Sequence, residues 1–273
     1  MASRRTIALL VLVLPLLVLA LLAAGCGGGD KRRAAYEDYV SGVNSAQEQF
    51  TPGYRSAVTT VRGFGSGSQP ARTAARLQDA ASTMRAARAS LALLRPPEEA
   101  RGLHRDFLRL LDLQARLSQE LALAAEYVPA VARVLTPPEE AAARLRGAIK
   151  NAGGAAQQRA ALERYTADLQ ASIDALDALA PPPVLVPWHQ AQAGRLEAGR
   201  ALAGELASAI AARRPDGVDR ALRAYAAAAP DDPALARAQA AAVHAFNGAI
   251  RRQQRLYARI TREQARISAE LSG

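Results

Sequence analysis

The residues that could do chemistry in this sequence are few, and their spacing argues against an enzyme or a metal site. None of the histidines, His104, His189 and His244, has a second ligand four residues further along. The Glu-x-x-His pattern of di-iron bundles is absent, as are nucleophile-elbow, phosphate-loop and dinucleotide motifs. The pairs Glu98-Glu99 and Glu139-Glu140 follow Pro-Pro, where acidic side chains complement the dipole of a starting helix. We therefore expect no enzymatic activity, no metal and no cofactor.

Three side chains remain candidates for contact with a ligand or partner. His104 and His189 each follow a Pro-Pro pair by about seven residues, and Trp188 is the sole tryptophan. The alternative is structural, because large aromatic side chains are usually packed against a core and buried histidines are usually hydrogen-bonded. Both interpretations stay open for these three residues.

The single cysteine, Cys26, lies at the end of an apolar N-terminal segment. Two arginines precede an uncharged stretch at residues 6–24, which is the order of a secretory signal. One cysteine cannot form an internal disulfide. The segment that ends at it resembles the lipobox of bacterial lipoproteins, Leu22-Ala23-Ala24-Gly25-Cys26. The resemblance implies cleavage after residues 1–25, a diacylglyceryl group on Cys26, and a place on the extracytoplasmic face of the cell membrane.

An uncleaved transmembrane anchor is the alternative, since about 20 apolar residues can cross a bilayer. Pro15 and the small residues before the cysteine favour cleavage. Residues 26–33 are then expected to form a flexible tether, because three glycines follow Cys26. The cations of this tether either contact anionic headgroups, at about 1 kcal/mol each, or are simply solvated. They are Lys31, Arg32 and Arg33.

The charge of the chain is basic but dispersed. Removal of residues 1–25 lowers the net charge from +10 to +8, and nearly all the positive charge is arginine. A basic exported protein suits anionic lipid, cell-wall polymer or nucleic acid. A nucleic-acid footprint normally forms a clustered patch, however, and these arginines are spread along most helices. We expect no nucleic-acid partner, and an envelope protein or polymer of unknown identity.

The hydrophobic spacing predicts an all-α protein, an antiparallel helical bundle that occupies residues 34–273. Apolar residues recur three and four positions apart, as in helical bundles. Proline pairs and Gly153-Gly154 are expected to end helices, and Thr136 to Glu139 has the spacing of a capping box. The predicted helices are 33–50, 71–94, 98–128, 138–151, 156–179, 187–213, 216–228 and 234–271, with a short piece at 54–62.

An internal duplication is also predicted. Shifting the sequence by 85 residues places Leu77 on Leu162 and, without a gap, Pro96-Pro97 on Pro181-Pro182. His104 then falls on His189. Matched leucines occur in any two amphipathic helices, but a matched proline break and histidine are more specific. We expect copies at about 71–152 and 156–230.

The lipobox, the Ala/Arg-rich helices and the Leu-x-Pro-Pro breaks are similar to a broad group of helical lipoproteins from high-GC Gram-positive bacteria. That resemblance implies surface exposure and supplies no activity. Our first hypothesis is a non-enzymatic, membrane-anchored binding or scaffold module of the cell envelope. The alternatives are an extracytoplasmic small-molecule receptor with a pocket between the duplicated halves and a metal-binding protein.

Overall fold

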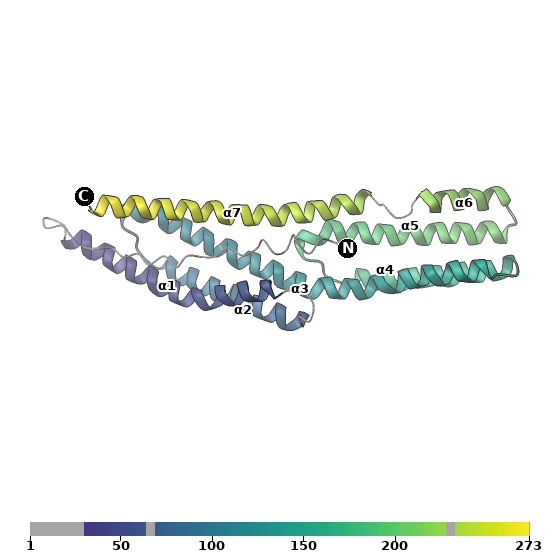
Figure 1. Cartoon of the computed structure of the whole chain (residues 1–273), viewed down its shortest axis with the longest axis horizontal. Helices are drawn as coiled ribbons and strands as arrows, with labels where there is room; N and C mark the ends of the chain where they lie inside the picture. Colours follow the sequence, from purple (N-terminus) through teal and green to yellow (C-terminus); the bar gives the residue numbers. More distant parts are fainter. Residues whose placement is uncertain (1–29, 64–68, 228–232, 273) are drawn as a thin grey trace. The chain divides into compact units, whose positions relative to one another are not determined.

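The computed structural model describes residues 30–63, 69–227 and 233–272, and every regular element in these ranges is helical. The described residues form seven α-helices that pack antiparallel within the parts of the chain, which confirms the all-α class of the prediction (Figure 1). Two 3-10 turns, η1 and η2, precede α3 and α5. The bounds are α1 Asp30–Arg62, α2 Pro70–Ala92, η1 Glu98–Ala100, α3 Arg101–Lys150, α4 Ala155–Asp177, η2 Pro183–Leu185, α5 Val186–Ala211, α6 Pro215–Ala227 and α7 Pro233–Ser272.

The chain divides into two compact units. Unit 1 comprises Met1–Ala125 and Phe246–Gly273, and unit 2 comprises Glu126–Ala245. Helices α3 and α7 therefore contribute residues to both units. Each unit has its own hydrophobic core.

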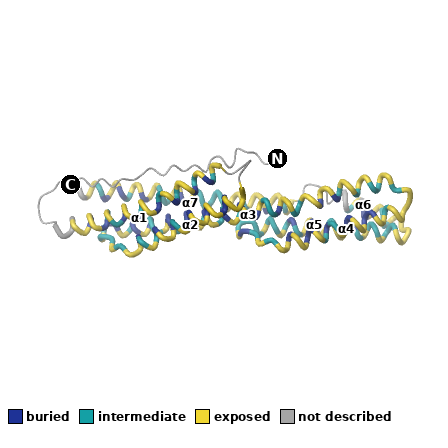
Figure 2. The backbone as a smooth tube through the Cα atoms, turned by 90° about the horizontal axis from the view of Figure 1, so that it is seen from below, coloured by how far each residue is buried: buried dark blue, intermediate teal, exposed yellow. Residues whose placement is uncertain are grey.

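The core of unit 1 is formed by α1, α2, the first half of α3 and the second half of α7. Leu77, Met84 and Leu91, which the periodicity places on one stripe of α2, are almost completely buried. Between them lie buried alanines such as Ala80 and Ala87. Small side chains at these positions let neighbouring helices approach closely, and buried positions recur along the helices at helical spacing (Figure 2).

The core of unit 2 is formed by the second half of α3 with α4 and α5. Leu162, Leu169 and Leu176 form the buried stripe of α4, and Leu196 of α5 packs in the same cluster. Helix α6 packs against α5. The sequence pattern located this stripe correctly, because an amphipathic helix must bury its apolar face.

Most of the predicted helix ends are confirmed. Helix α2 ends before Pro96-Pro97, α4 ends before Pro181, and Gly153-Gly154 separates α3 from α4. Helix α7 begins at Pro233, which is a favourable first position because proline has no N–H to leave unpaired.

The predicted break at Pro137-Pro138 is wrong, because α3 continues through it as one helix of 50 residues. The hydroxyl of Thr136 donates to the carbonyl of Ala132 at 2.9 Å, so Thr136 does not begin a capping box. Val131 and Ala141, on either side of the prolines, are both buried in the core of unit 2. Packing on both sides offsets the lost backbone hydrogen bonds, which local propensity alone does not anticipate.

The predicted separation of 33–50 from 54–62 is also wrong, since α1 runs unbroken through Pro52. Phe50 and Ala57 are buried in the same core on either side of this proline. A Cβ added to Gly53 would lie 2.7 Å from the Cβ of Thr83 in α2. The missing side chain at Gly53 thus permits a close approach that holds α1 against α2.

The predicted signal segment and lipid site, Leu22 to Cys26, lie outside the described residues. Helix α1 begins at Asp30, so the last four residues of the predicted tether are part of a helix. Across the described ranges, no helix combines the length and apolar character that a membrane span needs.

Candidate binding cavity in unit 1

His104, one of the candidate contact residues, is hydrogen-bonded to a tyrosine within the core of unit 1. Its Nδ1 lies 3.3 Å from the hydroxyl of Tyr39, and both residues are buried. Burial lowers the pKa of His104 and raises the pKa of Tyr39 above its ordinary range. A neutral imidazole with its proton on Nε2 accepts a hydrogen bond at Nδ1 from the phenol O–H, so this contact joins α1 to α3.

His189 has an equivalent partner in unit 2. Its Nδ1 lies 2.9 Å from the hydroxyl of Tyr127, and burial raises the pKa of Tyr127 to about 12. Trp188 packs edge-on against the same tyrosine, with ring centroids 6.5 Å apart. The structure therefore brings Trp188 and His189 together around Tyr127, in a contact that joins α3 to α5.

The remaining ionisable groups of interest are exposed or paired. His244 is exposed, and the described residues contain no cluster of His, Cys, Asp and Glu that could hold a metal ion. Asp106 is a buried carboxylate of α3, and Arg259 of α7 binds both of its oxygens. The Nη2 of Arg259 donates to Oδ1 of Asp106 at 2.5 Å. A bidentate partner of this kind marks Asp106 as a residue that ties α3 to α7.

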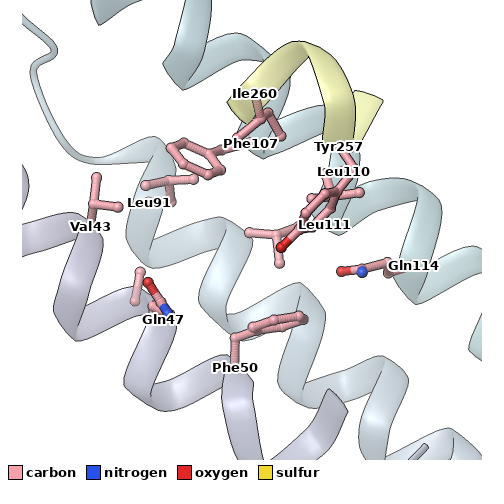
Figure 3. Close-up of a pocket in the computed structure, with 11 residues that line it drawn as sticks. Val43, Gln47, Phe50, Leu91, Phe107, Leu110, Leu111, Gln114, Tyr257 and Ile260 are labelled. Carbon is pink, nitrogen blue, oxygen red and sulfur yellow. The ribbon is translucent and has the colours of Figure 1, made fainter. Parts of the chain in front are cut away.

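An apolar cavity of about 80 Å³ lies among the four helices of unit 1. This volume exceeds what a single water molecule needs. Aromatic and aliphatic side chains from α1, α2, α3 and α7 surround it (Figure 3). The lining residues are Val43, Ala46, Gln47, Phe50, Leu91, Phe107, Leu110, Leu111, Gln114, Tyr257 and Ile260.

Gln114 is the distinctive group of this cavity. It is 3% exposed, and neither its amide oxygen nor its amide nitrogen has a hydrogen-bond partner among the described residues. The amide end points toward the space between Phe50 and Leu111 (Figure 3). Buried polar groups are normally hydrogen-bonded, and one without a partner costs about 1–3 kcal/mol. The cavity thus combines largely apolar walls with Gln114, a buried amide that can both donate and accept and that has no partner among the described residues.

Sequence reasoning did not select Gln114 as a candidate site residue. The signal was present, because Gln114 occupies a core position in the stripe that contains Phe107, Leu110 and Leu117. A polar residue at such a position is either exposed by local geometry or specifically used. Only the packing of the other three helices decides between these outcomes.

Comparisons with known proteins add no assignment. No protein family, curated protein or solved structure matches this chain. The cavity of unit 1 and the residues that line it are therefore the basis for assigning a function.

Proposed function

We propose that this protein is a lipid-anchored, extracytoplasmic, non-enzymatic helical module that binds an apolar small molecule in the cavity of unit 1. The observation that carries the proposal is Gln114, a buried amide at the wall of an apolar cavity that has no hydrogen-bond partner among the residues the structure describes. Ligand sites are typically apolar with a few polar groups that fix orientation. This favours the receptor class over a scaffold that binds through an outer helix face.

The location rests on the lipobox-like sequence at Leu22 to Cys26. A diacylated Cys26 would keep the helical units outside the cell and attached to the membrane. The cations at Lys31, Arg32 and Arg33 would then lie next to anionic headgroups.

We further propose that the two units descend from one duplicated segment. The offset of 85 aligns His104 with His189, and each histidine is bound by a tyrosine two α-helices earlier, on α1 for His104 and on α3 for His189. Each is also preceded by a Pro-Pro and a 3-10 turn, at Glu98–Ala100 and Pro183–Leu185. Tyr39 and Tyr127 lie 88 residues apart, so we place the start of each copy one helix earlier than the predicted 71–152 and 156–230, with a short insertion between the copies.

The anchor is tested by mass spectrometry of membrane-extracted protein. We expect an N-terminal peptide that begins at a diacylated Cys26, and its loss together with membrane retention in Cys26→Ala. Membrane fractionation of both variants provides the second readout. An intact N-terminus that retains residues 1–25 would contradict the proposal and indicate a transmembrane anchor.

The cavity is tested with N-phenyl-1-naphthylamine, a dye that fluoresces in apolar surroundings. The protein is the unlipidated mature chain, residues 26–273 with Cys26→Ala, so that no detergent competes for the dye. We expect saturable binding that Ala46→Leu weakens at least tenfold, because the added side chain fills the cavity. Ala35→Leu, an exposed alanine on the same helix, is the matched control. Equal binding by both variants would contradict the assigned site.

A further inference from the structure

Two smaller cavities adjoin the main cavity of unit 1. One, of about 60 Å³, shares Gln114 with it and extends past Ser118 toward Leu121. The other, of about 10 Å³, shares Val43 and Phe107 with it. The main cavity thus shares wall residues with each of the two smaller ones.

The three cavities follow one another along α3. Their walls on η1 and α3 span residues 100–107, 107–114 and 114–121 in turn. At 1.5 Å per residue this row of separate cavities is about 30 Å long. Packed helices lie about 8–10 Å apart, so the row is long and narrow. A single extended aliphatic chain has this shape, and a compact polycyclic molecule does not.

The walls are uncharged. Among the described residues that line the three cavities, none is Asp, Glu, Lys, Arg or His. Burial of an ionised headgroup without an opposite charge is strongly unfavourable. An uncharged hydroxyl or amide, in contrast, satisfies Gln114 by both donating to and accepting from its amide.

We infer that the ligand is a neutral, single-chain amphiphile whose unbranched alkyl chain lies along α3 and whose hydroxyl or amide group binds Gln114. This inference rests on the proposed function and narrows it to one ligand class. It further predicts that each methylene added to the chain is buried along this row of cavities.

The test measures binding of 1-hexanol, 1-octanol, 1-decanol, decanoate and 1-adamantanol to the unlipidated mature chain by competition with the dye. We expect affinity to rise about threefold or more with each added methylene up to 1-decanol, following the gain from burying one CH₂. Decanoate and 1-adamantanol should bind at least tenfold more weakly than 1-decanol. A plateau at 1-hexanol, or preferred binding of 1-adamantanol, would overturn the chain-shaped site and leave the proposed function standing.

Gln114→Leu tests the polar contact separately. We expect at least fivefold weaker binding of 1-decanol with an unfolding temperature that is equal or higher, because a buried amide without a partner is removed. Gln119→Leu, an exposed glutamine on the same helix, is the control. Unchanged 1-decanol binding by Gln114→Leu would refute the role of Gln114. If neither the dye nor any alcohol binds the unsubstituted protein, the proposed function fails as well.

Discussion

Buried polar side chains in unit 1 differ in how they are satisfied. His104 is bound by Tyr39, and Asp106 is bound by Arg259. Gln114 has neither kind of partner among the described residues. The first two contacts connect helices of the same unit, so a role in stabilising the fold explains them. Gln114 is not explained in this way, which is why the functional proposal centres on it.

His104 should make stability depend on pH. Burial lowers its pKa from the ordinary value of 6.5, so the unfolded chain binds a proton more readily than the folded chain. The free energy of unfolding contributed by this group should be constant above about pH 6.5 and should fall as the pH decreases below that value. Urea titrations between pH 5 and 8 measure this dependence.

The variant His104→Gln keeps an acceptor for Tyr39 and removes the titration. Its unfolding free energy should change less between pH 6.5 and 5 than that of the unsubstituted protein. An identical change in both proteins would show that His104 is not the group responsible.

The helices show how packing overrides local signals. Helix α3 contains Pro129, Pro137 and Pro138, and α1 contains Pro52. A proline within a helix removes one backbone hydrogen bond and crowds the preceding turn. These helices continue because their apolar faces are buried on both sides of each proline pair or single proline. The stabilisation from this packing can exceed the free-energy cost of the proline. The helix is nevertheless less stable than it would be without the proline.

Pro137→Ala tests this balance at an exposed position of α3. The alanine restores an N–H donor for the carbonyl of Arg133, so we expect the free energy of unfolding to rise by about 1–3 kcal/mol. Urea denaturation followed by circular dichroism measures the change. A decrease would mean that the proline stabilises the protein by restricting the unfolded chain.

At the scale of the whole molecule, stability is divided between two cores. Leu77 and Leu176 are each almost completely buried, one in each unit, and the leucine stripes that contain them align at the offset of 85. The two cores share no residues. A loss of packing in one core should therefore lower the stability of that unit more than the stability of the other.

Leu77→Ala and Leu176→Ala form a matched pair for this prediction. Each substitution should lower the free energy of unfolding by about 2–5 kcal/mol, because replacing a buried leucine with alanine leaves a cavity. Hydrogen exchange read by mass spectrometry should show faster exchange mainly in α2 for the first variant and in α4 for the second. Equal acceleration in both units from either variant would indicate a single cooperative structure.

The sequence by itself determined the helical fold, the leucine stripes of α2 and α4, and the breaks at Pro96-Pro97 and Pro181. These features depend on spacing within one segment, since a helix buries residues that recur three and four positions apart. It also supplied the lipobox-like segment at Leu22 to Cys26, whose interpretation needs no fold.

Only the tertiary structure decided that α3 continues through Pro137-Pro138 and that His104 and His189 are each bound by a tyrosine. The same holds for the cavity beside Gln114. Partners such as Tyr39 and His104 are 65 residues apart in the sequence. Contacts and cavities of this kind depend on how helices from distant segments fill the space between them, and spacing along one helix does not encode that volume.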